Sequence, residues 1–139
     1  MNMNSLVIVA GAARARMFRT AKTASPKVPV ELLELDAMEA SANDARGGGA
    51  AELADWARQI AMRASQFAHY HFCNPILVVA SEAVSAAILA ELERALPNVP
   101  VRRLPGDYVE LRPHELMPVL QEQAAFEPWP DRELGQIAL

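Results

Sequence analysis

The sequence predicts one α/β domain with a mixed sheet, in which three antiparallel strands come first, parallel strands follow, and about three helices cover the sheet. Two uninterrupted apolar runs, residues 6–10 and 76–80, are typical of strands buried on both faces. The amphipathic pattern of residues 50–70 is typical of a helix that packs one side against a sheet. With 139 residues, of which 52% are apolar, the chain can build one hydrophobic core.

The N-terminal part of the chain predicts an antiparallel meander. Residues 6–10 form the first expected strand, and residues 11–13 supply a turn. Each face of residues 14–20 would mix arginines with apolar side chains, so we expect a half-exposed strand that pairs back on the first. Residues 30–36 follow two prolines and are expected to form the third antiparallel strand.

A loop and a long helix come next. Residues 37–49 are small and polar, and we expect them to form a mobile loop. Apolar residues then recur at three-to-four spacing through residues 50–70, which predicts one buried helical stripe. The members of this stripe are Leu53, Trp56, Ala57, Ile60, Ala61, Ala64, Phe67 and Ala68.

The second half of the chain predicts a strand, a helix, a parallel strand and a last helix. Ser81 directly follows the strand 76–80 and is a suitable N-cap. Residues 101–104 are expected to be the next strand, because parallel pairing needs a crossover of this kind. Pro113 suits the first turn of the last helix, and residues 123–139 are expected to be an irregular tail. This order of elements is that of a ribonuclease-H-like fold.

Charge is distributed unevenly along the chain. The net charge is −4, yet residues 1–30 contain five Lys or Arg residues and no carboxylate, so the remainder carries −9 (−4 minus +5). A local basic face on an acidic body attracts an anionic partner. Cys73 is the only cysteine, and the apolar stretch 6–13 is far shorter than the roughly 20 residues that cross a bilayer. We therefore expect a cytoplasmic protein without a membrane segment.

Three consecutive glycines precede the long helix. Arg46, Gly47, Gly48 and Gly49 run straight into it, and amides at a helix start carry partial positive charge. Together with Arg14 and Arg16 of the first expected hairpin, they form the predicted RNA-binding or anion-binding site. The alternative is a mobile loop without a ligand, because the spacing fits neither a Walker loop nor a dinucleotide fingerprint.

Other chemical candidates have structural explanations. His69, His71 and Cys73 are residue types that bind zinc, but they lie at a helix end where alternate residues diverge, so we expect no metal and no cofactor. His114 followed by Glu115 suggests a general base with a carboxylate, yet adjacent helical residues point in different directions. Helix capping and packing explain that pair equally well.

Two further features bear on chemistry and assembly. Two-metal nucleases need converging carboxylates, one usually from the first strand, and residues 1–30 supply none. Trp56 lies on the apolar stripe and is expected in the core. Trp129 lies between two prolines, where it packs on its own domain or contributes to a homodimer.

Three segments resemble a known family. Residues 7–18, 76–80 and 112–116 are similar, in this order, to the bacterial "protein required for attachment to host cells" family. Members of that family resemble the middle domain of archaeal and eukaryotic class-one peptide release factors. The resemblance covers most of residues 5–121 and implies that residues 1–139 are a single domain of this release-factor type.

The release factors carry a Gly-Gly-Gln loop before a long amphipathic helix, and the loop reaches the peptidyl-transferase centre. Gly47 and Gly48 match its two glycines, but Gly49 stands where the glutamine would be. The first strand of the family commonly ends in an acidic residue, and this chain has Gly11 there. Peptidyl-tRNA hydrolysis is therefore not predicted.

These features together predict a non-enzymatic binding protein that contacts the ribosome or RNA through the glycine loop and the basic hairpin. Two alternatives stay open. The first is a hydrolase acting on a nucleotide or a peptidyl ester, to which His114 or a loop amide contributes. The second is a homo-oligomeric scaffold module.

Overall fold

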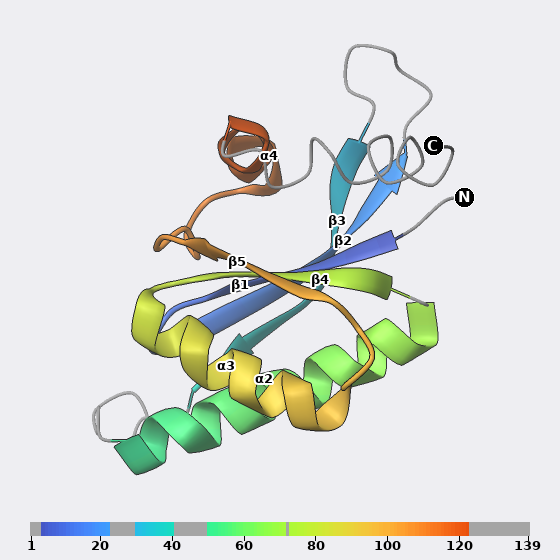
Figure 1. Cartoon of the computed structure of the whole chain (residues 1–139). Helices are drawn as coiled ribbons and strands as arrows, with labels where there is room; N and C mark the ends of the chain where they lie inside the picture. The colour runs from blue at the N-terminus through green and yellow to red at the C-terminus, as the bar shows by residue number, and fades with distance from the viewer. Residues whose placement is uncertain (1–3, 23–29, 41–49, 72, 123–139) are drawn as a thin grey trace.

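A computed structural model describes residues 4–22, 30–40, 50–71 and 73–122. These residues form a five-stranded sheet of order β3-β2-β1-β4-β5, with helices on both of its faces (Figure 1). The strands are β1 Asn4–Ala10, β2 Arg14–Lys22, β3 Val30–Glu39, β4 Cys73–Ala80 and β5 Val101–Pro105. The helices are α2 Ala50–His71, α3 Glu82–Ala95 and α4 Pro113–Glu122.

The strand directions confirm the predicted mixed sheet. β1 pairs with β2 and β2 with β3 in antiparallel fashion, whereas β1 with β4 and β4 with β5 are parallel. The chain can place β1 beside β4 because β2, β3 and α2 intervene between them in the sequence. Every predicted strand and helix is present, in the predicted order.

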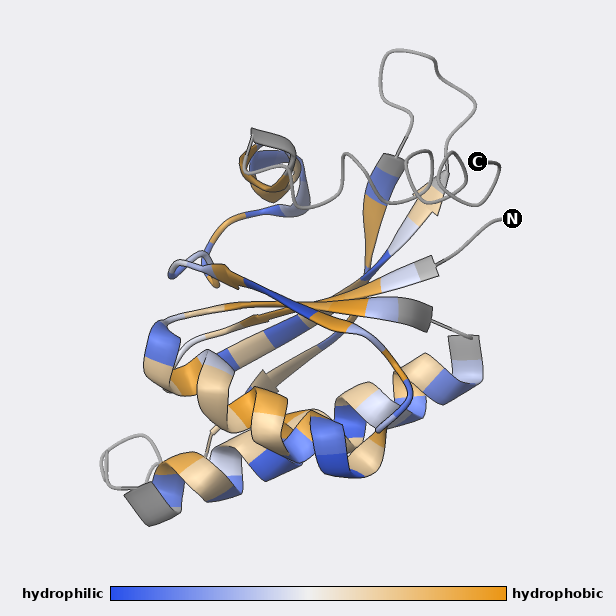
Figure 2. Ribbon diagram, viewed as in Figure 1, coloured by the Kyte–Doolittle hydropathy of each residue, from blue (hydrophilic) through white to orange (hydrophobic). Residues whose placement is uncertain are grey.

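α2 and α3 cover one face of the sheet. The predicted stripe of α2 enters the core there, where Trp56, Ala57 and Ile60 are at most 2% exposed. Val84, Ile88 and Leu92 of α3 join the same cluster. Figure 2 shows hydrophobic residues along the central strands β1 and β4, and hydrophilic residues along α2 and α3. The 3.6-residue period of these helices thus determines which side meets the sheet.

α4 lies on the opposite face. Leu116, Met117 and Leu120 of this helix pack in a second cluster with Phe18 and with Val7, Leu77 and other sheet residues. Coverage of both faces corrects one expectation: β2 is not half-exposed. Ala15, Met17 and Phe18 are each 0% exposed, because Met17 lies in the first cluster and Phe18 in the second.

The expected loop starts later than predicted. β3 continues to Glu39, since residues 37–39 pair with residues 14–16 of β2. The Ala40 amide also donates a hydrogen bond to the Ala13 carbonyl, at 2.8 Å. The rest of the expected loop, 41–49, and the expected tail, 123–139, lie outside the described residues.

Helix termini follow the sequence signals. The Ser81 hydroxyl accepts a hydrogen bond from the Val84 amide at 3.5 Å, which makes Ser81 the N-cap of α3 as predicted. Pro113 is the first residue of α4, and the Glu115 carboxylate accepts a hydrogen bond from the Arg112 amide at 2.9 Å. None of the described helices combines the length and the apolar character that a membrane crossing requires.

Candidate active site

The three parallel strands end level with one another. Register pairs Val9 of β1 with Val79 of β4, and Ala80 of β4 with Pro105 of β5. The residues that directly follow the strand ends are Gly11, Ser81 and Gly106, and we call this border of the sheet the carboxyl edge. Beyond it the chain turns from β1 toward β2 and from β4 toward α3 and β5. In open α/β sheets, ligands bind at the carboxyl ends of two neighbouring strands whose connections run in opposite directions.

Gly11 begins a tight turn that is fixed from two sides. Its amide donates to the Arg14 carbonyl at 2.7 Å, which closes the turn between β1 and β2. Its carbonyl accepts a hydrogen bond from the indole Nε1 of Trp56 at 2.9 Å. Trp56 itself is 2% exposed, so α2 holds the end of β1 through a buried side chain. Ala12 and Ala13, at the turn, are exposed.

The segment that follows β5 folds back over the carboxyl edge. Gly106 has a φ of +148°, a conformation that favours glycine, and its amide donates to the Ala80 carbonyl at 3.1 Å. Asp107 then lies beside the end of β1: its Oδ1 is 3.9 Å from the position that a Cβ on Gly11 would take. Asp107 is exposed, and no residue in the described ranges pairs with its carboxylate. The edge thus presents an available carboxylate next to a glycine turn.

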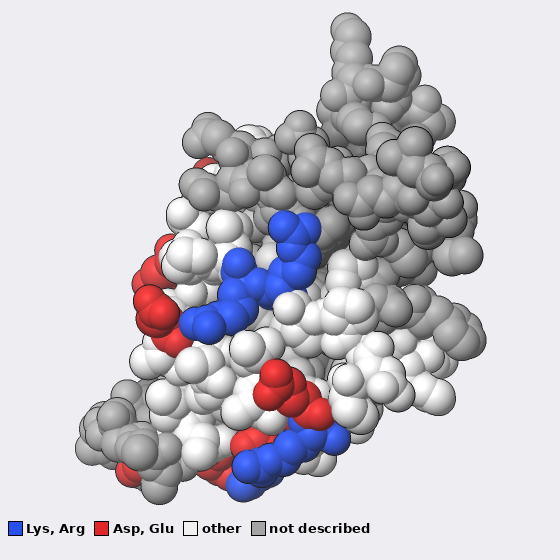
Figure 3. All heavy atoms as spheres, in the orientation of Figure 1, with Lys and Arg blue, Asp and Glu red and all other residues white. Residues whose placement is uncertain are grey.

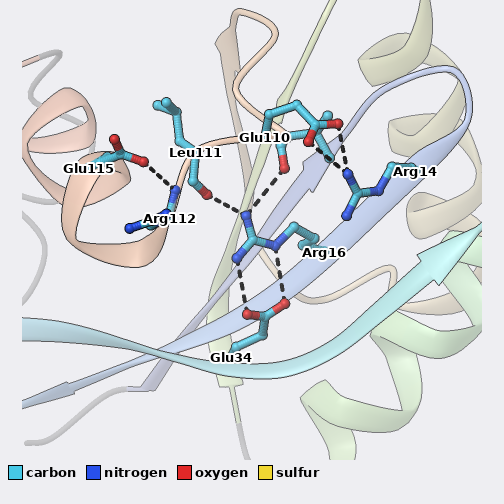
Figure 4. A network of polar contacts seen from close by, with 8 residues as sticks. Arg14, Arg16, Glu34, Glu110, Leu111, Arg112 and Glu115 are labelled. Atoms are coloured by element: carbon cyan, nitrogen blue, oxygen red, sulfur yellow. Dashed lines mark hydrogen bonds and ion pairs between the residues drawn. The ribbon is translucent and has the colours of Figure 1, made fainter.

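Arg16 fastens this segment to the sheet (Figure 4). Its Nε and Nη2 bind the two carboxylate oxygens of Glu34 on β3, at 3.1 and 3.0 Å. Its Nη1 donates to the Val109 carbonyl at 3.2 Å and to the Leu111 carbonyl. The guanidinium also lies 4.9 Å from the centre of the Phe18 ring, and the side chain is only 13% exposed. Arg16, predicted to bind an anion, is therefore occupied by its own protein.

Arg14 is placed differently. Its Nη1 binds both carboxylate oxygens of Glu110, at 2.7 and 2.8 Å, and the two side chains are 43% and 73% exposed. In the part of the chain that the structure describes, Nε and Nη2 of Arg14 have no partner. Of the two arginines predicted in the first hairpin, only Arg14 keeps donors available at the carboxyl edge.

The other predicted candidates do not join this edge. Arg46, Gly47, Gly48 and Gly49 lie outside the described residues, so the structure says nothing about the glycine loop. His69 and His114 are both exposed on helices, and Glu115 has the capping contact given above. Among residues 4–22, 30–40, 50–71 and 73–122, no three His, Cys, Asp or Glu side chains come together to hold a metal ion.

The structure also shows basic residues that the sequence interpretation missed. A band of Lys and Arg side chains crosses the face drawn in Figure 3, over β5, the strand that carries Arg102 and Arg103. Arg103 donates to the Ser85 hydroxyl at 3.1 Å and lies 3.8 Å from a carboxylate oxygen of Glu82, in the first turn of α3. The consecutive arginines in an otherwise apolar strand were the available signal. They indicate an edge strand, where both side chains can reach water.

No family model matches the chain, and no curated protein sequence matches it. Solved structures do resemble it. RuvC of Thermus thermophilus superposes with a TM-score of 0.53 at 15% identity, over 74% of this chain and 64% of RuvC. An exopolyphosphatase from Cytophaga hutchinsonii gives a TM-score of 0.53 at 13% identity, over 75% of this chain and 35% of that protein.

The chain has a ribonuclease-H-like fold. A PPX-GPPA enzyme from Aquifex aeolicus also shares it, with a TM-score of 0.50 at 16% identity, over 74% of this chain and 36% of the enzyme. This chain therefore spans only about a third of the PPX-GPPA enzyme and of the exopolyphosphatase. At these identities the likeness establishes the fold alone.

The prediction of a non-enzymatic protein that binds the ribosome or RNA is wrong. Two of the three structures compared above are enzymes by name, the exopolyphosphatase and the PPX-GPPA enzyme. Of the residues predicted for that binding site, Arg16 is occupied by Glu34 and two backbone carbonyls.

Proposed function

We propose that this chain is a hydrolase that cleaves a phosphate ester or phosphoanhydride bond, such as that of a nucleotide, at the carboxyl edge. The observation that carries the proposal is the level end of the parallel strands, followed by Gly11, Ser81 and Gly106, with Arg14 and Asp107 beside the first of these. The name of the exopolyphosphatase, whose structure resembles this chain, supports a phosphate substrate.

Phosphoryl transfer to water depends on positioning and on charge stabilisation more than on covalent chemistry by the protein. A bond from water oxygen to phosphorus forms while the bond from phosphorus to the leaving oxygen breaks. The Arg14 guanidinium matches the negative charge on the phosphate oxygens. The Asp107 carboxylate, next to the Gly11 turn, can orient the attacking water and accept its proton.

Small side chains at this edge serve the same chemistry. Ala12 and Ala13, in the turn between Gly11 and Arg14, are short and exposed. A phosphate group can therefore approach the main chain without displacing a large side chain. Mg²⁺ in phosphate sites keeps several waters and binds the substrate's own phosphate oxygens, so it would enter here with the substrate and leave the Asp107 carboxylate to the attacking water.

A phosphate-release assay tests this proposal. Pyrophosphate, tripolyphosphate, ATP, GTP and p-nitrophenyl phosphate would be incubated with the protein, with Mg²⁺ or with a chelator. Release with at least one of them is expected, and Asp107→Asn should lower its rate about 100-fold or more. Glu93→Gln, an exposed carboxylate on α3, is the matched control and should keep the wild-type rate. Equal rates for the two variants, or no release from the panel, would refute the proposal.

Three expectations from the sequence remain proposals. A cytoplasmic location is supported by the single cysteine, Cys73. Membership of the host-attachment family is supported by the order of the three similar segments, 7–18, 76–80 and 112–116. A homodimer is supported by the placement of Trp129 between two prolines, and sedimentation of the intact chain would reveal it.

A further inference from the structure

Arg14 and Glu110 form an exposed ion pair beside the carboxyl edge. Both side chains are open to water, with exposed fractions of 43% and 73%. Exposed ion pairs contribute little to stability, because water and salt compete for each partner. The pair can therefore open without disturbing the fold.

The guanidinium of Arg14 is only partly used by this pair. Both bonds to Glu110 come from one nitrogen, Nη1. Nε and Nη2 form no hydrogen bond or ion pair with any described residue, so one side of the guanidinium remains for two parallel bonds to a second oxyanion. A phosphate with more than one negative charge would attract this group more strongly than a single carboxylate does.

The backbone around Glu110 is fixed on both sides. Arg16 holds the carbonyls of Val109 and Leu111, the residues immediately before and after it. Figure 4 shows the two arginines side by side on β2. Arg16 binds the main chain of the segment around Glu110, whereas Arg14 binds only the Glu110 side chain. Release of Arg14 therefore requires only that the Glu110 side chain rotate into solvent.

Resting on the function proposed above, we propose that Arg14 is the phosphate-binding residue of the carboxyl edge and that Glu110 is an internal competitor for it. In the unliganded protein Glu110 occupies Arg14. A phosphate ligand takes over the guanidinium, and Glu110 swings away while Arg16 keeps the segment in place. The exchange makes the site selective for ligands of high negative charge, because a weakly charged anion does not displace the carboxylate.

Two substitutions distinguish the proposed exchange from a surface ion pair that has no role in binding. Arg14→Gln removes the binding group, so the affinity for magnesium pyrophosphate should fall about tenfold or more. Glu110→Gln removes the competitor and should raise the affinity about two- to fivefold, as expected when a weak sequestering contact is lost. If Glu110 instead served only to hold Arg14 in position, Glu110→Gln would lower the affinity for magnesium pyrophosphate, because the guanidinium would lose its orientation.

Titration calorimetry of the intact protein with magnesium pyrophosphate measures these changes. Arg58→Gln is the matched control, since it removes the same charge from an exposed arginine that is paired on α2, and its affinity should equal that of wild type. Circular dichroism would confirm that all three variants fold. The proposal is overturned if Arg14→Gln binds like Arg58→Gln, if Glu110→Gln binds more weakly than wild type, or if neither wild type nor Glu110→Gln binds. Hydrolysis in the separate release assay judges the proposed activity independently of these affinities.

Discussion

Replacing Arg16 with methionine is expected to destabilise the protein by about 2–4 kcal/mol. The substitution removes the bidentate pair with Glu34 and two bonds to backbone carbonyls, at a side chain only 13% exposed. Each bond from a charged donor contributes about 1.5–3 kcal/mol when its partner is buried. Glu34 is 36% exposed, so its carboxylate binds water again in the variant. The total loss of stability is therefore well below the loss from breaking a fully buried ion pair. Methionine keeps an apolar contact with the Phe18 ring.

Thermal and urea unfolding, followed by circular dichroism, measure this loss. For 139 residues an unfolding entropy of roughly 2.1 cal/mol/K per residue converts it to a fall in Tm of about 7–14 °C. Arg16→Lys should lose less, because an ammonium group keeps the charge but cannot reach Glu34 and both carbonyls together. Arg58→Met, at a side chain 58% exposed, is the control and should change stability by at most about 0.5 kcal/mol. If Arg16→Met costs no more than Arg58→Met, the structural role assigned to Arg16 is wrong.

Four further substitutions test the elements that support the carboxyl edge, each by the same unfolding measurements. Trp56→Phe removes the indole bond to the Gly11 carbonyl and should cost about 1–2 kcal/mol; an unchanged stability would mean that α2 does not hold the turn. Gly106→Ala should cost about 1–3 kcal/mol, because its φ is +148° and the new Cβ would lie 2.3 Å from the Tyr108 ring. Gly11→Ala meets only ordinary contacts and should cost less than Gly106→Ala, so the reverse order contradicts the geometry. Leu116→Ala, at a fully buried site of α4, should cost about 2–4 kcal/mol, and a value near zero would show that α4 does not cover the sheet.

The strands and helices could be predicted because each one carries its own local signal. Residues 76–80 are continuously apolar, the stripe of α2 repeats every three to four residues, and Pro113 starts α4 where a helix tolerates proline. The antiparallel and parallel pairings followed from the lengths of the connections, since a short turn can join only antiparallel neighbours.

The candidate site was harder to predict from the sequence than the strands and helices were. Gly11, Ser81 and Gly106 each follow a predicted strand directly, but they lie far apart in the sequence. Only the register of β1, β4 and β5 shows that they end level. The glycines at 47–49 are consecutive and therefore predicted a binding loop, whereas a single glycine after a strand is a weaker signal.

Arg14 and Arg16 of β2 show most clearly what the sequence could not predict. They have the same charge and lie two residues apart, so both were predicted to bind an anion. Glu34, a partner of Arg16, is 18 residues away along the chain. The other partners are Glu110 and the carbonyls of Val109 and Leu111, which are 93 to 96 residues away. Local periodicity determined that β2 is a strand and which faces its side chains take. Tertiary packing alone decided that Arg16 is enclosed and Arg14 is open, because a guanidinium is satisfied by whichever acceptors the folded chain brings within reach.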